Sequence, residues 1–288
     1  MKQFAPCTEN TVIAPYTSMR VGGPVRYLCR PETEEQFIAL LEHCKGISMP
    51  YLVIGNASNL LFPDEGFDGA VIATGSIRGL TIEGDRITAL CGTPLSALSV
   101  FAMEHGRRGL AFAYGIPGTV GGGVYMNAGA YGGELSDCLE TAVCIDSAGA
   151  QVVLTKEELG LSYRHSRLQE EELYLLRATF LCVTGDKAEI KAEMDRNMAS
   201  RKEKQPLEFP SCGSAFKRPV GHFAGALIQE AGLKGFSVGG AQVSEKHAGF
   251  VINKGGATAK DIKDLLEYVR KTVYAKSGVH LEPEIQIL

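Results

Sequence analysis

Residues 115–133 read GIPGTVGGGVYMNAGAYGG and carry no charged side chain. Glycine lets a backbone approach a ligand closely and adopt positive φ angles, but it costs conformational entropy on folding. A flexible linker would be polar and rich in serine, whereas this run interleaves its glycines with Ile116, Val120, Val124 and Met126. We therefore interpret the run as a backbone cradle for a ligand.

The same run lacks the signatures of the common nucleotide-binding loops. Residues 118–123 have neither the Lys-Ser/Thr pair of a P-loop nor the glycine spacing of a dinucleotide fingerprint. The charge-free span 109–133 resembles a membrane segment in polarity, but its nine glycines and Pro117 disfavour a continuous helix in lipid. We expect its N–H groups to face a cofactor.

Composition narrows the class of protein. The chain has 288 residues, 45% of them hydrophobic, and a net charge of −4. These values are typical of a globular protein with one large or a few smaller domains, and they argue against a nucleic-acid binder, which normally carries a basic surplus. The N-terminal MKQFAPCTEN contains no apolar signal or anchor, so we expect a cytoplasmic protein with small-molecule partners and no membrane association.

The cysteines and histidines predict neither disulfides nor a metal site. The eight cysteines are scattered without a C-x-x-C pair, in a chain too long to need disulfide staples. We therefore expect reduced thiols in the core. The six histidines show no metal-ligand spacing, so no metal is predicted.

The N-terminal part predicts a small α/β unit. Residues 25–29 and 51–54 are apolar and read as strands, and a helix beginning at Thr33 places Phe37, Leu40, Leu41 and Cys44 on one face. The second strand runs into GNASNLL at 55–61, a position where strand ends commonly carry ligands. Consecutive N–H groups in this turn could hold a pyrophosphate. A turn that only reverses the chain is the alternative.

The remaining elements are short strands and several helices. Short strands with glycine turns are expected over 70–90, a helix capped by Thr93 up to Gly106, and further strands at 139–145 and 173–183. A charged helix over 186–205 is interpreted as a link between domains. The capping box of Thr258 and Asp261 predicts a helix ending near Gly278, followed by a terminal strand. On that strand Glu282 and Glu284 share one face, and Ile285 and Ile287 the other.

Six motifs in order resemble the UDP-N-acetylenolpyruvoylglucosamine reductase family: GNASNLL, GIPGTVGGGVYMNAGAYGGE, YRHS, PSCGSAFKRP, HAGFVINKGGATAKDI and LEPEIQIL. The resemblance spans nearly the whole chain. It implies an α+β fold: a two-part FAD-binding domain of the vanillyl-alcohol-oxidase-like (PCMH-type) class, with subdomains at 1–74 and 75–200, and a C-terminal α/β substrate domain at 201–288. No insertion between Arg164 and Ser214 is long enough for the tyrosine-bearing loop of larger members, so the chain is similar to the compact subtype.

The resemblance also implies the chemistry. FAD, held non-covalently, would mediate the NADPH-dependent reduction of UDP-N-acetylglucosamine enolpyruvate to UDP-N-acetylmuramate, a step of bacterial peptidoglycan precursor synthesis. By similarity, the FAD-contacting residues would be Gly55, Asn56, Ala57, Ser58, Asn59, Leu60, Gly115, Pro117, Gly118, Thr119, Gly121, Gly122, Gly123, Asn127, Ala128, Gly129 and Ala130.

Three residues match the family positions for the second half-reaction. Arg164 would stabilise the enolate, Ser214 would donate a proton, and Glu284 would act beside them. Strand parity alone does not separate Glu284 from Glu282. The proposed contacts with the sugar nucleotide, by weaker arguments, are Lys217, Arg218, His247 and Asn253.

Two other functions remain open at this point. A different FAD-dependent oxidase or dehydrogenase of the same superfamily, acting on a small hydroxylated substrate, would share the cradle but would not need Arg164, Ser214 and Glu284 together. A catalytically silent sugar-nucleotide-binding module is the second alternative. For the reductase we expect a monomer.

Overall fold

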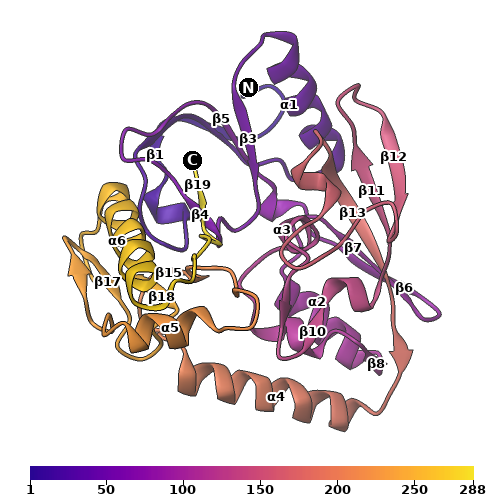
Figure 1. The fold of residues 1–288 in the computed structure, drawn as a ribbon. Coiled ribbons are helices and arrows are strands. Elements are labelled where there is room, and N and C mark those ends of the chain that lie inside the picture. Colours follow the sequence, from indigo (N-terminus) through magenta and orange to yellow (C-terminus); the bar gives the residue numbers. More distant parts are fainter. The chain divides into compact units, whose positions relative to one another are not determined.

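Two groups of segments cluster separately in the computed structural model, which describes residues 1–288 (Figure 1). Unit 1 comprises residues 1–9, 27–56 and 69–200, and unit 2 comprises residues 10–26, 57–68 and 201–288. The division near residue 200 resembles the predicted one. The segments 10–26 and 57–68, however, cluster with the C-terminal residues rather than with the first predicted subdomain.

A four-stranded sheet contains the predicted N-terminal α/β unit. Its strand order is β1 (Cys7–Val12), β2 (Pro24–Cys29), β5 (Phe67–Ala73) and β3 (Tyr51–Ile54), and β3 runs parallel to β5. Helix α1 (Glu34–Gly46) begins after Thr33, whose side chain accepts a hydrogen bond from the Gln36 N–H. It buries Phe37, Leu40, Leu41 and Cys44, which confirms the predicted apolar face.

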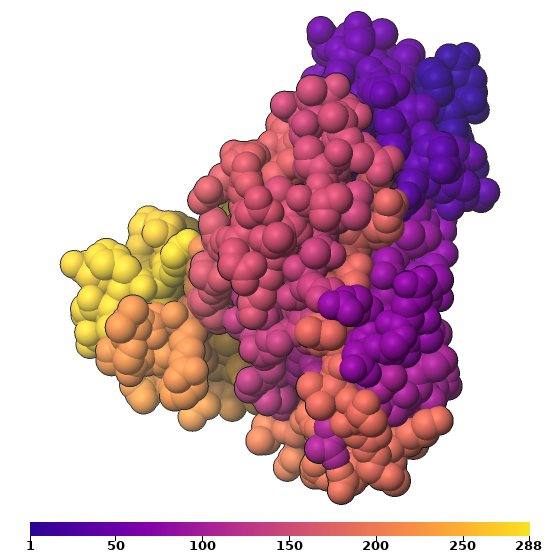
Figure 2. Space-filling view, turned by 90° about the vertical axis from the view of Figure 1, so that its right-hand side faces the viewer, coloured from indigo at the N-terminus to yellow at the C-terminus, as the bar shows by residue number.

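An antiparallel five-stranded sheet forms the larger part of unit 1. Its order is β12 (Gln151–Thr155), β11 (Leu139–Ile145), β13 (Tyr174–Leu181), β7 (Arg86–Leu90) and β6 (Leu80–Glu83). Residues in the pink range of the bar, which include β11 and β12, form much of the surface in Figure 2.

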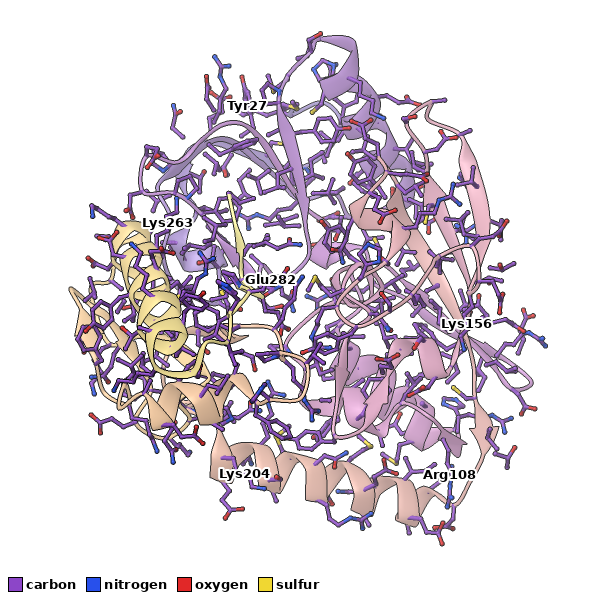
Figure 3. All side chains as sticks on the ribbon, in the orientation of Figure 1. Tyr27, Arg108, Lys156, Lys204, Lys263 and Glu282 are labelled. Atoms are coloured by element: carbon purple, nitrogen blue, oxygen red, sulfur yellow. A yellow bond between two sulfur atoms is a disulfide. The ribbon has the colours of Figure 1, made fainter.

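Helices and short strands complete unit 1. They are η2 (Thr74–Ser76), α2 (Leu95–Glu104), β8 (Arg107–Arg108), η3 (Ala111–Gly115), α3 (Val120–Tyr125), β9 (Gly129–Ala130), β10 (Gly133–Glu134), η4 (Leu135–Asp137), η5 (Arg167–Gln169) and β14 (Val183–Thr184). Helix α4 (Lys187–Lys204) matches the predicted charged helix. Arg108, labelled in Figure 3, pairs with Glu189 near the start of α4.

Unit 2 is built on an antiparallel sheet of β15 (Ser211–Ser214), β18 (Phe250–Asn253), β17 (Ala241–Val243) and β16 (Ser237–Val238). It also contains η1 (Ala14–Tyr16), α5 (Ala224–Glu230) and α6 (Ala259–Ser277), and β4 (Leu60–Leu61) pairs in parallel with β19 (Gln286–Ile287). The predicted capping box of α6 forms, and the helix ends at Gly278 with φ +70°. Both ends of this helix are therefore confirmed.

Two local predictions are wrong. Pro94 rather than Thr93 caps α2, because the Thr93 hydroxyl bonds instead to the backbone N–H and carbonyl of Gly79. The terminal strand is only two residues long, and Ile287 is 43% exposed while Ile285 is buried.

The prediction of reduced thiols is wrong for one pair. Cys7 and Cys29 form a disulfide between the neighbouring strands β1 and β2, where their Cα atoms lie 4.1 Å apart. The other six cysteines are free and buried. Burial raises the pKa of the Cys91 and Cys212 thiols to about 12, which keeps both neutral and unreactive.

No helix is both long and apolar enough to cross a membrane. The charge-free span 109–133 forms η3, α3 and β9 instead of one continuous helix.

Candidate functional site

The two predicted cofactor motifs meet within unit 1. Strand β3 ends at Ile54, and the Asn56 Nδ2 then donates to the Pro117 carbonyl at 3.0 Å. A Cβ added at Gly55 would lie 2.2 Å from the Thr119 hydroxyl oxygen, which no real side chain could tolerate. A side chain at position 55 would force the Thr119 side chain or the 55–56 turn to shift, because the second motif packs directly against the first.

The three consecutive glycines of α3 serve two purposes. A Cβ at Gly121 would lie 3.2 Å from the Cys91 carbonyl oxygen, and one at Gly123 would lie 3.0 Å from Leu135. Packing within the chain thus explains these two glycines, which we had attributed to a ligand. Gly122 is different, because it is exposed and the nearest atom to an added Cβ, the Thr119 hydroxyl oxygen, is 3.8 Å away. No protein atom requires glycine at that position.

Thr119 and Gly118 fix the start of α3. The Thr119 side chain caps the helix by accepting from the Gly122 N–H, although at 3.4 Å this bond is long. Gly118 is buried and its carbonyl accepts from the Leu95 N–H at 3.0 Å. Gly115 ends η3, immediately before Ile116. These hydrogen bonds fix the start of α3 and therefore the position of Gly122 in its first turn.

Asn127 uses its side chain inside the protein. It is fully buried with φ +39°, its Oδ1 accepts from the Ser136 N–H at 3.0 Å, and its Nδ2 donates to the Ser162 carbonyl at 3.1 Å. Ala128 follows, with its N–H bonded to the Gly123 carbonyl, and Gly129–Ala130 form β9. Any contact of this part with a cofactor would come from the backbone.

Arg164 lies in a tight turn next to this run. Ser162 and His165 exchange two backbone hydrogen bonds of 3.1 Å, and Arg164 between them has φ +57°, the left-handed region that only glycine adopts freely. Its guanidinium donates to the Gly129 carbonyl at 3.2 Å and lies 5.0 Å from the centre of the Tyr163 ring. The turn thereby holds a permanent cation against the glycine-rich run.

Ser214 and Glu284 both belong to unit 2. The register between β15 and β18 shifts between Ser211 and Ser214, and Gly213 in this bulge has φ +76°. A bulge turns the following side chain out of the regular alternation, and Ser214 is exposed. The Glu284 N–H donates at 2.9 Å to the carbonyl of Ala215, the residue that follows Ser214.

Glu282 is engaged elsewhere. Its carboxylate pairs with the Lys217 ammonium at 2.5 Å, and its side chain is 69% exposed on the C-terminal segment, where Figure 3 labels it. The backbone repeats this pairing, since the Lys217 N–H donates to the Glu282 carbonyl at 2.8 Å. Glu282 is therefore held in an ion pair, and Lys217 has a partner within the protein.

The other substrate candidates differ in their surroundings. The Arg218 guanidinium lies 4.0 Å from the centre of the exposed Phe223 ring. His247 is half-buried; its Nδ1 accepts from the Gly249 N–H, and burial lowers the pKa of its imidazole. Asn253 is only 7% exposed, and its amide bonds to the Met19 carbonyl and to the N–H groups of two loop residues. We therefore assign Asn253 a structural role.

Residues of the 57–60 turn belong to unit 2 and partly support Glu284. Ala57 is buried with φ +46°, Ser58 follows it, and Leu60 lies in β4 opposite Gln286. The Asn59 Nδ2 donates to the Glu284 carbonyl at 2.9 Å. The sequence predicted Asn59 as a residue of the cofactor turn and gave no sign of its hydrogen bond to Glu284. That bond depends on the pairing of β4 with β19, which brings the two segments together.

The residues of unit 1 fit a flavin nucleotide. The turn at 55–56 and the start of α3 are adjacent, and neither carries a charged side chain. Because Gly122 has no side chain, the space beside its backbone stays open. Backbone N–H groups at such a place suit a diphosphate or a ring edge.

Two sequence models of known domains match the chain. The model described as "FAD binding domain" matches residues 25–155, and the model of the C-terminal domain of UDP-N-acetylenolpyruvoylglucosamine reductase matches residues 205–288.

Curated relatives are similar over nearly the full length. The UDP-N-acetylenolpyruvoylglucosamine reductase of Lactobacillus delbrueckii subsp. bulgaricus is 48% identical over 280 residues, which cover 97% of this chain and 94% of that protein. The same enzyme of Caldicellulosiruptor bescii is 48% identical over 275 residues, covering 95% and 88%. A crystal structure of the Thermus caldophilus enzyme matches with a TM-score of 0.83 and 36% identity, covering 96% of this chain and 97% of that one. These matches confirm the predicted α+β class with a flavin-binding and a C-terminal domain.

Proposed function

The chain belongs to the UDP-N-acetylenolpyruvoylglucosamine reductase family and is an FAD-dependent oxidoreductase that reduces this enolpyruvyl sugar nucleotide, and we propose how its own residues divide the work. FAD, when bound, supplies the chemistry of hydride transfer between NADPH and the enolpyruvyl group. In this proposal the turn at 55–60 and the run at 115–130 hold FAD, and residues 201–288 bind the sugar nucleotide. The observation that carries the proposal is the backbone hydrogen bond from the Glu284 N–H to the carbonyl of Ala215, the residue that follows Ser214 at the β15 bulge.

Arg164 stabilises negative charge on the substrate. Hydride addition to the methylene carbon pushes an electron pair towards the substrate carboxylate and forms an enolate. A guanidinium is always charged and offers paired donors, so it can bind a carboxylate in the ground state and more strongly as charge grows. Because the turn fixes the Arg164 backbone, little reorganisation is required when the charge develops.

Ser214 completes the reduction by protonating the neighbouring carbon. The enolate electron pair takes the hydroxyl proton, a C–H bond forms, and the serine oxygen recovers a proton from water. A serine is a weak acid, so position must compensate for its pKa. In this proposal Glu284, whose N–H bonds to the carbonyl of Ala215, the residue after Ser214, shares a hydrogen bond in this exchange.

In this proposal, polar groups of unit 2 recognise the sugar nucleotide. Arg218 is exposed and suited to a diphosphate, and His247 is a weaker candidate. Lys217 contributes only if its pair with Glu282 opens. We further propose a monomer that works in the cytoplasm on small-molecule substrates and supplies peptidoglycan precursors.

The test separates the two half-reactions. Purified protein is reduced with NADPH without oxygen until the flavin band bleaches, and UDP-N-acetylglucosamine enolpyruvate is then added. We expect the band to return in the wild type and in Ser211→Ala, a control on the same strand, but to return at least tenfold more slowly in Ser214→Ala. Equal slowing of bleaching and recovery in Ser214→Ala would contradict the proton-donor role.

A further inference from the structure

Gln169, at the end of η5, binds two backbone carbonyl oxygens with one nitrogen. Its Nε2 lies 2.6 Å from the Tyr125 carbonyl oxygen and 3.1 Å from that of Arg164. A carbonyl oxygen only accepts hydrogen bonds, so the amide nitrogen and not the amide oxygen must face both. The side chain therefore ties Arg164 to the last residue of α3.

The Arg164 backbone needs such a tie. A non-glycine residue in the left-handed region is strained, and it persists only where the surroundings over-determine it. Ser162 and Tyr163 are exposed, so the two hydrogen bonds of the turn face competition from water. Gln169 adds a third bond, and it acts on the carbonyl of the strained residue itself.

The same junction connects the turn to the glycine-rich run. The hydroxyl of the fully buried Ser166 donates to the Tyr125 carbonyl at 2.8 Å, and Asn127 binds the Ser162 carbonyl from the other side. Two amide side chains thus link the Arg164 turn to both ends of the segment 125–127. We propose that Gln169 is a positioning residue: it sets the Arg164 guanidinium relative to the glycine-rich run for the reduction step. This inference rests on the catalytic role proposed for Arg164.

Gln169→Met tests the idea, because methionine has a similar length and volume but no N–H donor. We expect flavin reduction by NADPH to stay within about twofold of the wild type, while recovery of the flavin band with the enolpyruvyl substrate slows about tenfold, as for a misplaced catalytic group. Gln36→Met is the matched control. Gln36 also bonds to a backbone group of unit 1, the Glu32 N–H, but on α1. Should Gln169→Met fail to accumulate, Gln169→Glu, which keeps the shape and cannot donate when ionised, takes its place with the same expectation.

A double-mutant cycle with Arg164→Lys separates positioning from general support. If Gln169 acts through Arg164, Gln169→Met should slow the reoxidation step less than about twofold in the Arg164→Lys background. Multiplication of the two single effects would overturn the proposal. A normal rate in Arg164→Lys alone would instead refute the role of Arg164, and with it the catalytic meaning of Gln169.

A readout independent of turnover tests the geometry itself. In flavin-free protein, hydrogen exchange of the Ser162 and His165 amides, which close the turn, should be at least tenfold faster in Gln169→Met than in the wild type and unchanged in Gln36→Met. Unchanged exchange in Gln169→Met would show that the turn holds without this side chain, and the inference would fail even if the role of Arg164 stood.

Discussion

The contact between Gly55 and Thr119 leads to the prediction that two destabilising substitutions compensate each other when they are combined. In Gly55→Ala the new Cβ would lie 2.2 Å from the Thr119 hydroxyl oxygen, so either the cap of α3 or the 55–56 turn must move. Strain from such overpacking costs about 2 kcal/mol. Thr119→Ala removes a long capping bond of 3.4 Å and should cost about 1 kcal/mol.

The two changes should compensate in the double variant. Once the Thr119 oxygen is gone, the nearest Thr119 atom to the new Cβ is its own Cβ, at 3.3 Å, which a shift of a few tenths of an ångström relieves. We therefore expect Gly55→Ala/Thr119→Ala to lose only about 1 kcal/mol, against a sum of about 3 kcal/mol for independent sites, a coupling of about 2 kcal/mol.

Urea unfolding of the flavin-free proteins, followed by circular dichroism, measures all four free energies of unfolding. FAD titration of the same set should follow the same order, with Gly55→Ala the weakest binder. The reasoning is refuted if the double variant is as unstable as the sum of the single variants, because the two motifs would then not be in contact.

Three further predictions concern separate features. Asp64→Ala removes a carboxylate that accepts from the Ala259 and Lys260 N–H groups at the start of α6, and should lower the free energy of unfolding by about 1–2 kcal/mol, seen as a lower Tm than in the wild type. Gly122→Ala should keep FAD and Gly122→Leu should lose it, measured by flavin absorbance per protein, since Gly122 alone among the α3 glycines leaves open space. Burial lowers the pKa of the His247 imidazole, so the unfolded chain binds a proton at this residue more readily than the folded protein does. The stability that this difference contributes is present above about pH 6.5 and is lost as the pH falls, which lowers the Tm. We expect Tm to decrease less steeply with falling pH in His247→Gln than in the wild type.

Helix ends that are fixed by residues close to one another in the sequence could be predicted from the sequence. Thr33 with its apolar face, and Thr258 with Asp261 and Gly278, act within a few residues of one another, and each formed as expected. Thr93 shows the limit of such signals. Its hydroxyl has a distant competitor, the Gly79 backbone, which wins over the cap that the sequence suggests.

The parts that sequence did not predict depend on long-range pairing. The disulfide joins Cys7 to Cys29 because β1 and β2 are neighbours, although their spacing carries no recognisable motif. Gln169 carries no sequence signal of its role, since its partners are backbone carbonyls of other segments. The catalytic candidates could be found because family motifs mark them, whereas the residues that hold them in place are visible only in the structure.

In the glycine-rich run, two different causes can favour glycine: close approach of a ligand and tight packing within the protein. Its density suggested a ligand throughout, yet an added Cβ at Gly121 or Gly123 would meet Cys91, Leu95 or Leu135 at a tight 3.0–3.2 Å, so packing alone favours glycine there. A search for binding residues in such runs should therefore weigh each glycine by the space that an added Cβ would find. By that criterion Gly122 and Gly132 are the glycines of this run at which an added Cβ would find open space.

Unit 2 contains two N-terminal segments besides residues 201–288, and we therefore predict that residues 201–288 do not fold alone. This holds although the sequence model of a C-terminal domain matches nearly the same range, residues 205–288. Met19, Val21 and Leu61 from the N-terminal segments are buried in its core, and Asp64 caps α6. Fully burying side chains of this kind contributes about 1.5–3 kcal/mol each, so the loss of all three removes roughly 4.5–9 kcal/mol, comparable to the whole stability of a small domain. An isolated 201–288 fragment should give poorly dispersed NMR spectra and bind hydrophobic dyes, and adding a peptide that spans residues 57–68 should only partly restore dispersion, because Met19 and Val21 are still missing. A well-dispersed spectrum from 201–288 alone would show that the C-terminal segment is self-sufficient and that the N-terminal segments merely cover it.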